Sequence, residues 1–521
     1  MMPARQNTSL VSLQYLLKGL ASVGSDLFVE NMELDARKIQ ENDVFIAVAG
    51  SQAHGLEYAE QAIQAGAVAI IYDPASGGNF LAERIKKQQR IELIELADLT
   101  AHISTIAARL YQHPSRELSV VGITGTNGKT SVSHYIAQAL DAKNSKRQPM
   151  SAVIGTLGWG PIGQLQETIN TTPDAISVQR QLSTLLTEGV ETVAMEVSSH
   201  GLDQGRVSAV DFKGAVFTNL SHDHLDYHQT IEAYGEAKLS LFKSPSLEFV
   251  VLNKDDEFSA RIVQSLSERV RVYSFSRSEK LFEAENCWLI SNEQLTSTGL
   301  MFDLSFNGQA ARVQSALFGA FNIDNLVATM AVLTALGDSF DEAVSKVASI
   351  NGVSGRMQQV AKNELSPTVV VDYAHTPEAL RLALLSLRQH CEGLLTVIFG
   401  CGGNRDEAKR PLMGAIAADL ADSVVLTSDN PRFESAVDIA EQIKQGMPNG
   451  TECKVILDRA EAIQQTIAAA ERSDIVLLAG KGHENYQQIQ ANKIKFSDVA
   501  QAQEVLKARL MSNAGGDGCK R

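Results

Sequence analysis

The segment 122–130 has the residue types and spacing of a phosphate-binding loop. It reads G-I-T-G-T-N-G-K-T and lies between an apolar run at 118–121 and a helical pattern. Glycines let backbone N–H groups curl around phosphate oxygens, and a helix N-terminus adds a favourable dipole. Lys129 could reach the β- and γ-phosphates, and the Thr130 hydroxyl could hold Mg²⁺. The strict G-x-x-x-x-G-K-[ST] form is not met, because Ile123 stands where it needs Gly. A tight turn without a ligand is the alternative, but the strand–turn–helix context favours a nucleoside triphosphate.

Three polar clusters follow in the next hundred residues, at the ends of expected strands, where open α/β sheets place their ligands. The first, M-E-V-S-S-H at 195–200, offers the Glu196 carboxylate as a hard oxygen ligand for Mg²⁺. The second, N-L-S-H-D-H-L-D-Y-H at 219–228, could bind zinc or form a solvated loop. Magnesium is favoured over zinc, because no third cluster has zinc-ligand spacing and a phosphate loop is near. In the third, Y-G-E-A-K-L-S-L-F at 234–242, Lys238 taken alone is most simply a solvated charge on an amphipathic helix.

Further polar motifs lie in the last 200 residues. G-G-N-R-D at 402–406 and D-N-P-R at 429–432 each follow an expected strand. On its own, D-N-P-R is typical of a Pro-containing turn. Asn322 and Asn325, in the segment F-N-I-D-N, could equally cap a helix or contact a nucleotide.

Composition excludes several classes of protein. The formal net charge of −15 argues against a general nucleic-acid or membrane-surface partner. The five cysteines are scattered without a C-x-x-C pair, which suits reduced thiols and offers no disulfide framework. No signal-like or 18-residue apolar stretch occurs, so we expect a cytoplasmic protein with no membrane insertion.

Length and alternation predict an α/β protein of three domains. At 521 residues the chain is too long for one core. Strand-like and helical runs alternate throughout, and breaks at 113–115 and 352–355 suggest the boundaries. We therefore expect domains at residues 1–113, 114–354 and 355–521. The middle one should be of P-loop type with a mostly parallel sheet and the last of doubly wound Rossmann type. We expect an irregular tail from Ser512.

Six motifs in order give the chain a family resemblance. They are T-G-T-N-G-K-T, M-E-V-S-S-H, H-D-H-L-D-Y-H, Y-x-x-A-K-x-x-L-F, V-D-Y-A-H-T-P at 371–377 and G-K-G-H-E at 480–484. Together they resemble the Mur ligases of peptidoglycan synthesis. The resemblance implies an N-terminal UDP-binding domain, a central ATPase domain and a C-terminal domain that brings an amino acid. It also implies the reaction: ATP phosphorylates a substrate carboxylate, and an amine displaces phosphate from the acyl phosphate to form an amide.

The resemblance assigns metal-binding and catalytic roles in the central domain. It implies that Lys238 is carbamylated by CO₂, which turns an ammonium that cannot ligate a metal into an anionic oxygen ligand. Lys238, Glu196 and His224 would then surround one Mg²⁺, and Thr130 and Glu196 would hold another. Together with Lys129 these are the expected catalytic residues. The expected ATP-binding residues are Gly125, Thr126, Asn127, Gly128, Lys129, Thr130, Asn322, Asn325, Arg356, Asp372 and His375.

The remaining expectations from the resemblance concern two substrates. D-N-P-R marks members that add meso-diaminopimelate rather than lysine, so the expected partners are ATP, UDP-N-acetylmuramoyl-L-Ala-D-Glu and meso-diaminopimelate, bound by a monomer. The diaminopimelate site would comprise Arg405, Asp429, Asn430, Pro431, Arg432, Gly480 and Glu484. The UDP-muramoyl-dipeptide site would comprise Leu34, Ala36, Asn170, Thr171, Thr172, Ser198, Gln204 and Arg206.

Two positions depart from the family pattern in the N-terminal domain. Ala36 stands where a serine is usual, and His54 stands where an aspartate is usual. Uridine contacts carried by those two side chains are therefore in doubt. The rival interpretations are the D-alanyl-D-alanine-adding Mur ligases, folylpolyglutamate synthetases and a non-catalytic nucleotide-binding regulator. Neither rival ligase matches D-N-P-R and G-K-G-H-E together, and intact Lys129, Glu196, His224 and Lys238 argue against a regulator.

Overall fold

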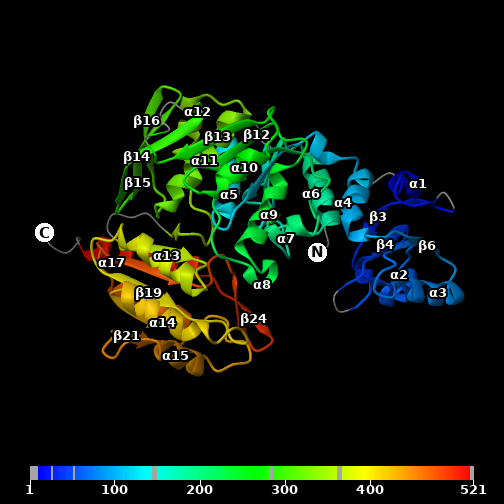
Figure 1. The fold of residues 1–521 in the computed structure, drawn as a ribbon. Helices are drawn as coiled ribbons and strands as arrows, with labels where there is room; N and C mark the ends of the chain where they lie inside the picture. The colour runs from blue at the N-terminus through cyan, green and yellow to red at the C-terminus, as the bar shows by residue number, and fades with distance from the viewer. Residues whose placement is uncertain are drawn as a thin grey trace. The chain divides into compact units, whose positions relative to one another are not determined.

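The computed structural model describes residues 10–24, 27–50, 53–142, 149–278, 280, 285–360 and 366–516. Ser51 and Gln52 of the G-S-Q-A-H-G segment and Cys519 lie outside these ranges. The chain divides into two compact units, Met1–Ser274 and Phe275–Arg521 (Figure 1). The boundary expected near residue 113 falls inside the first unit and the one near 354 inside the second, so both stay predictions.

The first unit begins with a small parallel sheet, as the alternation of its sequence predicts. Strands β3, β4, β5 and β6 pair in that order, all parallel. Every residue of β4 and β5 is buried, which is typical of strands covered on both faces. The elements of this part are β1 (Val11–Ser12), α1 (Leu13–Leu16), β2 (Phe28–Val29), β3 (Asn31–Glu33), η1 (Ala36–Lys38), β4 (Asp43–Ala47), η2 (Gly55–Tyr58), α2 (Ala59–Gln64), β5 (Ala69–Tyr72), α3 (Gly78–Gln88), β6 (Glu92–Glu95) and α4 (Leu99–Leu110).

The rest of the first unit is built on a second, mostly parallel sheet, as expected. Its strands lie in the order β12-β11-β7-β10-β8-β9, and only β9 runs antiparallel to its neighbour. The elements are η3 (Pro114–Arg116), β7 (Ser119–Thr124), α5 (Lys129–Asp141), β8 (Ser151–Gly155), β9 (Gly158–Gly160), α6 (Ala175–Thr187), β10 (Thr192–Glu196), α7 (Ser199–Asp203), β11 (Phe212–Phe217), α8 (Leu225–His228), α9 (Ile231–Phe242), β12 (Phe249–Asn253), α10 (Phe258–Ser265) and β13 (Arg271–Ser276).

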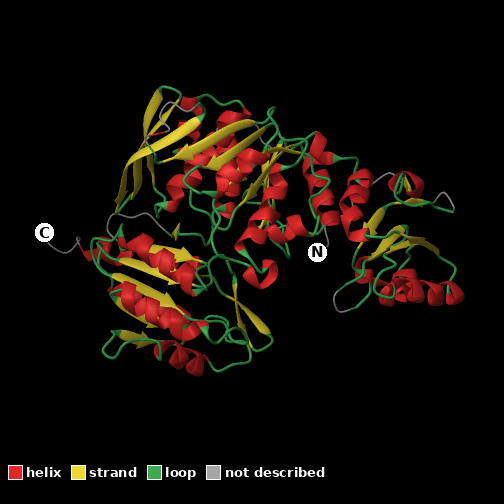
Figure 2. Ribbon diagram, viewed as in Figure 1, coloured by secondary structure: helices red, strands yellow, loops and turns green. Residues whose placement is uncertain are grey.

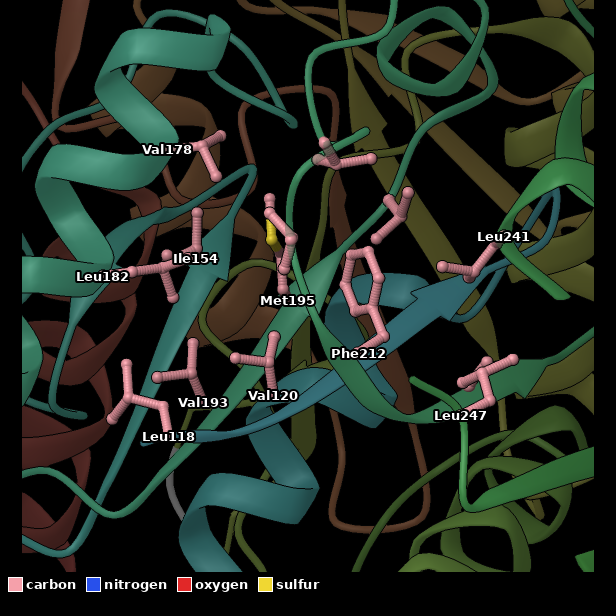
Figure 3. Packing of buried hydrophobic residues seen from close by; sticks show 14 of the residues in the cluster. Leu118, Val120, Ile154, Val178, Leu182, Val193, Met195, Phe212, Leu241 and Leu247 are labelled. Carbon is pink, nitrogen blue, oxygen red and sulfur yellow. The ribbon is translucent and has the colours of Figure 1, made fainter. Parts of the chain in front are cut away.

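One face of this sheet carries a continuous apolar core (Figure 3). Val193 and Met195 are two residues apart on β10, so their side chains leave the same face of the sheet. Val178 and Leu182 are four apart on α6, so they form a stripe that packs on that face. All four side chains are fully buried. The polar loops of the candidate site follow the ends of β7, β10 and β11.

A polar hub ties the N-terminal sheet to α6 within the first unit. The Arg180 guanidinium donates to Glu33 Oε1 at 2.6 Å, Asn31 Oδ1 at 3.1 Å and the Tyr111 hydroxyl at 2.9 Å. Burial raises the pKa of Glu33, and the neighbouring Arg180 opposes that rise. Because Arg180 lies on α6, Asn31 and Glu33 on β3 and Tyr111 at the end of α4, the hub links α6 to these two elements.

The second unit opens with an antiparallel meander that the sequence analysis did not anticipate. Strands β14 (Cys287–Thr296), β15 (Gly299–Phe306) and β16 (Gln309–Ser315) pair in sequence. The buried indole of Trp288 stacks on Phe306, with ring centroids 4.3 Å apart, and on Phe340. Two helices follow, α11 (Phe321–Leu336) and α12 (Phe340–Val347).

The remainder of the second unit is the expected doubly wound sheet (Figure 2). Its strand order is β17-β18-β22-β19-β20-β21, parallel except for β17. Alternate residues point to opposite faces: Val370 joins the core under α13–α15, whereas Val369 and Val371 join the core under α16 and α17. The elements are β17 (Gln358–Gln359), β18 (Thr368–Asp372), α13 (Pro377–Arg388), β19 (Leu395–Phe399), α14 (Lys409–Leu420), β20 (Ser423–Leu426), α15 (Ala436–Lys444), β21 (Cys453–Val455), α16 (Arg459–Ala469), β22 (Ile475–Ala479), β23 (Tyr486–Ile489), β24 (Asn492–Lys495) and α17 (Asp498–Gly516).

The end of the chain and the cysteines bear on two earlier expectations. The prediction of an irregular tail from Ser512 is wrong for residues 512–516, because α17 continues to Gly516. In the described ranges, Cys287, Cys391, Cys401 and Cys453 are free thiols. None of the helices that the structure describes has both the length and the apolar character needed to cross a membrane.

Candidate active site

The candidate residues fall into two groups, one in each unit, and the phosphate loop anchors the first. Gly125 and Gly128 both adopt positive φ, 148° and 87°, which only glycine tolerates readily. A Cβ on Gly125 would lie 1.9 Å from Thr218 Oγ1. Lys129 opens α5 and bends back over the loop, where its Nζ donates to the carbonyls of Gly125 and Thr126 at 2.8 Å each. The loop therefore presents an ammonium above backbone groups at a helix N-terminus, the arrangement that suits phosphate.

The end of β11 holds this loop in shape. The Asn127 N–H donates to Asn219 Oδ1 at 2.9 Å, and the Thr126 N–H donates to the Asn219 carbonyl at 2.8 Å. Thr218 Oγ1 donates to the Asn127 carbonyl at 2.6 Å. Because these bonds join the loop to a neighbouring strand end, they fix the course of its backbone.

Glu196 is a buried carboxylate with neutral partners. It is 1% exposed at the end of β10. Its Oε2 accepts from the hydroxyls of Thr130 at 2.9 Å and Thr156 at 3.0 Å, and its Oε1 accepts from the Thr156 N–H at 2.9 Å. No Lys or Arg in the described ranges forms an ion pair with it. A Cβ on Gly155 would lie 2.1 Å from Oε1, so glycine is required there. A buried carboxylate beside a threonine hydroxyl has the donor chemistry that Mg²⁺ prefers.

Lys238 is buried, which makes the interpretation as a solvated charge wrong. Its side chain is 1% exposed on α9, Nζ donates to the Gly125 carbonyl at 2.9 Å, and it lies 4.2 Å from the centre of the Tyr234 ring. Burial lowers the pKa of Lys238 well below its usual range, and the charge of Lys129 lowers it further. No carboxylate in the described part of the chain pairs with it. A neutral amine of this kind is the form that reacts with CO₂, so the residue fits carbamylation.

His224 lies at the edge of the same group. It adopts a left-handed φ of 53° where α8 begins, and its side chain is 46% exposed. Its ring centroid is 4.9 Å from that of His200 and 6.0 Å from that of Tyr234. Burial lowers the pKa of His200, and nearby His224 adds to that effect. The described residues hold no group of three or more His, Cys, Asp and Glu side chains arranged around a common metal position.

Five of the residues expected to line the muramoyl channel form a network beside Glu196. Thr172 Oγ1 donates to the Glu196 carbonyl at 3.0 Å and accepts from the Ser198 N–H at 2.9 Å. Arg206 donates to the Thr172 carbonyl at 2.6 Å and holds Gln204 Oε1 through Nε and Nη2. Thr171 Oγ1 lies 3.0 Å from Thr156 Oγ1. Asn170 lies in the exposed segment that precedes them.

The N-terminal candidates lie in the small parallel domain. Leu34 is half-buried against the N-terminal core, and buried Ala36 opens η1, which Asp35 caps. His54 is the N-cap of η2: its Nδ1 accepts from the Leu56 N–H at 3.1 Å, and its Nε2 donates to the Asp73 carbonyl at 2.9 Å. Both ring nitrogens of His54 are thus used within the domain, a structural role that the sequence pattern did not indicate.

The candidate nucleotide residues of the second unit lie at two places. Asn322 and Asn325 are buried in the first turns of α11, where Asn322 Nδ2 donates to the Phe318 carbonyl at 2.7 Å and Asn325 Nδ2 to Asn322 Oδ1 at 3.0 Å. Neither is the N-cap, which is Ala320 and makes no side-chain cap bond, so the capping alternative is wrong.

The second place is the end of β18. Asp372 accepts the Met357 N–H at 2.7 Å, and burial raises its pKa. The Arg356 guanidinium lies 5.2 Å from the centre of the Tyr373 ring, and Nδ1 of His375 donates to the Tyr373 carbonyl at 2.8 Å. Desolvation lowers the pKa of His375. Arg356, Asp372 and His375 are therefore brought together.

The candidate amino-acid site gathers the D-N-P-R and G-K-G-H-E segments. Asp429 is 9% exposed, makes no hydrogen bond or ion pair with any residue that the structure describes, and has a pKa raised by burial. Asn430 Nδ2 donates to Glu484 Oε2 at 2.8 Å. Arg432 follows buried Pro431 with a φ of 50°, and its Nη1 donates to the Gly403 carbonyl at 2.7 Å. The site thus contains carboxylates for an ammonium and a guanidinium for a carboxylate.

Gly480 and Arg405 complete the expected set. A Cβ on Gly480 would lie 2.8 Å from Asp429 Oδ2, so glycine lets the two segments meet. Arg405 is exposed on the loop after β19 and has no hydrogen bond to the described residues. Two residues that were not expected, Thr156 and Lys481, both bond to candidate residues. A single Thr in a loop carries no signal, but Lys481 stands between two glycines of a recognised motif.

Three models of Mur ligase domains match successive parts of this chain. Residues 29–109 match the Mur ligase family, catalytic domain; residues 123–333 match the Mur ligase middle domain; and residues 355–482 match the Mur ligase, glutamate ligase domain. A UDP-N-acetylmuramoyl-L-alanyl-D-glutamate–2,6-diaminopimelate ligase of Coxiella burnetii is 41% identical over 482 residues, which are 92% of this chain and 96% of that protein.

Solved structures agree with these matches. A structure of a UDP-N-acetylmuramoyl-L-alanyl-D-glutamate–2,6-diaminopimelate ligase superimposes with a TM-score of 0.70 and 34% identity, covering 96% of this chain and 99% of that one. The MurF ligase from Thermotoga maritima in complex with ADP shares the fold, with a TM-score of 0.57 and 17% identity, over 93% of this chain and 99% of that one. The chain therefore belongs to the Mur ligase family and has its three α/β domains.

Proposed function

We propose that this chain is an ATP-dependent ligase that adds meso-diaminopimelate to UDP-N-acetylmuramoyl-L-alanyl-D-glutamate in peptidoglycan synthesis. The observation that carries the proposal is 41% identity, over 92% of the chain, with a Coxiella burnetii ligase named for that reaction. ADP in the Thermotoga maritima relative supports ATP as the phosphate donor. The enzyme works as a cytoplasmic monomer, with domains at residues 1–113, 114–354 and 355–521.

The first chemical step is the transfer of a phosphoryl group. A carboxylate oxygen of the muramoyl dipeptide attacks the γ-phosphorus of ATP, the bond to the β,γ-bridging oxygen breaks, and an acyl phosphate and ADP result. Lys129 and the ordered loop 125–130 hold the phosphates and offset the charge that develops on the transferred group. The hydrogen bonds that fix the loop to the end of β11 support this role, because phosphoryl transfer depends on positioning more than on covalent help.

The protein groups around the reacting phosphate fit two magnesium ions and a carbamate. Thr130 and Glu196 would hold one ion, and Glu196, His224 and carbamylated Lys238 the other. These ions would neutralise charge between the substrate carboxylate and the γ-phosphate. Two observations support this assignment. Glu196 is buried and accepts hydrogen bonds from neutral partners, and burial lowers the pKa of Lys238.

The second step forms the amide. The diamino acid's amine attacks the acyl carbon, the bond to phosphate breaks, and phosphate and a proton leave. Arg432 binds the distal carboxylate of the amino acid, and Asn430 orients the same end. Arg405 and Glu484 hold the other charged groups of the substrate, and Asp429 binds an ammonium group. Asp429 supports this role, because a buried carboxylate without a hydrogen-bond partner is stabilised by an incoming cation.

The muramoyl dipeptide is held by the first unit. Leu34 and Ala36 lie at the uridine end, and Asn170, Thr171, Thr172, Ser198, Gln204 and Arg206 line the channel. Asn322, Asn325, Arg356, Asp372 and His375 bind the nucleotide. The network of Thr172, Ser198, Gln204 and Arg206 beside Glu196 supports the channel assignment.

Phosphate release tests this function. Incubated with ATP and Mg²⁺, the enzyme should release phosphate only when both the UDP-muramoyl dipeptide and meso-diaminopimelate are present, and mass spectrometry should find the tripeptide. Lys129→Ala is the matched control and should lower turnover by orders of magnitude. Phosphate release that needs D-alanyl-D-alanine or glutamate instead, or release unaffected by Lys129→Ala, would contradict the assignment.

A further inference from the structure

A turn with two left-handed glycines directs Lys481 into the protein interior. The strand β22 ends at Ala479, and Gly480 and Gly482 adopt φ values of 110° and 53°. A Cβ on Gly482 would lie 2.7 Å from Tyr373 Cβ, so the chain cannot turn this closely with a larger residue. Lys481, between them, has a side chain that is 0% exposed. The G-K-G segment therefore places an ammonium beneath the candidate amino-acid site.

The ammonium of Lys481 joins two candidate substrate residues. Its Nζ donates to Glu484 Oε2 at 3.0 Å and to Asn430 Oδ1 at 3.2 Å. Asn430 Nδ2 closes the triangle by donating to the same Glu484 oxygen at 2.8 Å. The Gln488 N–H also donates to Asn430 Oδ1, at 2.8 Å. Two donors on one side of the amide and a carboxylate on the other fix the orientation of Asn430.

The charges of this group depend on one another. Glu484 has a side chain that is 19% exposed, and its second oxygen, Oε1, makes no hydrogen bond with any residue in the described ranges. Burial raises the pKa of Asp429, and the charge of Glu484 adds to the rise, whereas Arg459 and Lys481 oppose it. Removing one partner of a buried ion pair leaves the other charge uncompensated, which is strongly unfavourable. Without Lys481, Glu484 would lose its ion-pair partner, and Asp429 would lose one of the two cations that lower its pKa.

We infer that Lys481 is a positioning residue for the amino-acid substrate. It holds the Glu484 carboxylate and the Asn430 amide as one unit and leaves Glu484 Oε1 directed to the substrate's ammonium. This inference rests on the proposed function for the identity of the amino acid. Lys481 does not touch the substrate; it acts through Glu484 and Asn430.

The test compares Lys481→Met with Lys493→Met. Lys493 is exposed on β24, lies 4.1 Å from the centre of the Tyr486 ring, and has no bond to Glu484 or Asn430, so it is a matched control. For Lys481→Met we expect kcat/KM for meso-diaminopimelate to fall on the order of 100-fold, chiefly through KM. The KM values for ATP and the muramoyl dipeptide should stay within about twofold, because the Lys481 ammonium bonds to Glu484 and Asn430 and to none of the described residues proposed to bind those two substrates. Lys493→Met should match the unmodified enzyme. Equal losses for all three substrates, or an unchanged KM for the amino acid, would overturn the inference.

A double variant keeps the test decisive if Lys481→Met folds poorly. Lys481→Met with Glu484→Gln removes both members of the ion pair, so neither partner is left as an uncompensated charge. If Lys481 acts through Glu484, the double variant should lose no more amino-acid affinity than Glu484→Gln alone. Fold-losses that multiply would show independent action and would overturn the inference. The unmodified enzyme, assayed with a panel of amino acids, tests the proposed function separately: whichever amino acid it uses, the KM comparison of the variants still applies.

Discussion

Replacing Arg432 with lysine or methionine tests how the site selects its amino acid. Both replacements keep a non-glycine residue at the φ of 50°, so the backbone cost is unchanged. The guanidinium uses one Nη1 hydrogen for the Gly403 carbonyl, and the Arg432 backbone is held by Gln488 and Gln490. Its other N–H groups can reach a carboxylate bidentately, which a lysine ammonium cannot.

The size of the effect follows from the number of hydrogen bonds. A hydrogen bond to a charged group contributes about 1.5–3 kcal/mol. Arg432→Lys should lose one of two such bonds to the distal carboxylate of meso-diaminopimelate, which corresponds to about a 10- to 100-fold lower kcat/KM. Arg432→Met should lose both, a fall of about 10²- to 10⁴-fold. L-lysine lacks that carboxylate, so the low kcat/KM expected for L-lysine should not fall in either variant. It should rise in Arg432→Met, because this replacement removes a positive charge that faces the positively charged side chain of L-lysine.

Phosphate release measured with both amino acids gives the required values. The KM values for ATP and the muramoyl dipeptide, and the melting temperature, serve as controls for general damage. Comparable kcat/KM for L-lysine and meso-diaminopimelate in the unmodified enzyme would refute the reasoning. So would an Arg432→Met variant that loses activity with both amino acids to the same extent.

Three further predictions concern other buried groups. Lys238→Ala should be nearly inactive, and a short carboxylic acid should partly restore its activity. In ¹³C-labelled bicarbonate, the NMR spectrum of the unmodified enzyme should show a carbamate carbon that this variant lacks. An active enzyme with no such signal would refute carbamylation. His390 accepts the Gly319 N–H at 2.9 Å through Nε2 and donates to Thr296 from Nδ1, and burial lowers its pKa. As pH falls below about 6.5, the unfolded chain takes up a proton that folded His390 refuses, so stability should fall with pH. His390→Gln keeps both bonds without titrating, and its melting temperature should decline less between about pH 7 and 5; identical pH profiles would exclude this contribution. Arg180→Met should lower the free energy of unfolding by about 2 kcal/mol. Breaking a fully buried ion pair costs ~3–5 kcal/mol, and the loss here is smaller because the Arg180 side chain is 33% exposed. That corresponds to a melting temperature about 4–8 °C lower, and Arg180→Met with Glu33→Gln should lose less than the sum of the single losses.

Local spacing was enough to predict the phosphate loop and the strands that present the site. The turn at 122–130 requires glycine at fixed positions, and it forms between β7 and α5 as its pattern predicts. The expected strands before the motifs at 195–200, 402–406 and 429–432 form as β10, β19 and β20, because burial on both faces of a parallel sheet demands short apolar runs. Motifs that follow such strands lie at the sheet edge, so their identity as candidate sites could be inferred from sequence.

Burial and pairing were decided only by the tertiary structure, because they join residues far apart in the chain. Lys238 resembles a solvated lysine on its helix, yet it is buried against Gly125, 113 positions away. Lys481 acquires its role from Asn430, 51 positions away, and Glu196 from Thr156, 40 positions away. His54 looked like a substitution in a substrate motif, but its two ring nitrogens cap η2 and bond Asp73. Sequence periodicity reports which face of an element is apolar, whereas the charge state and hydrogen bonding of a side chain depend on which distant groups exclude water from it.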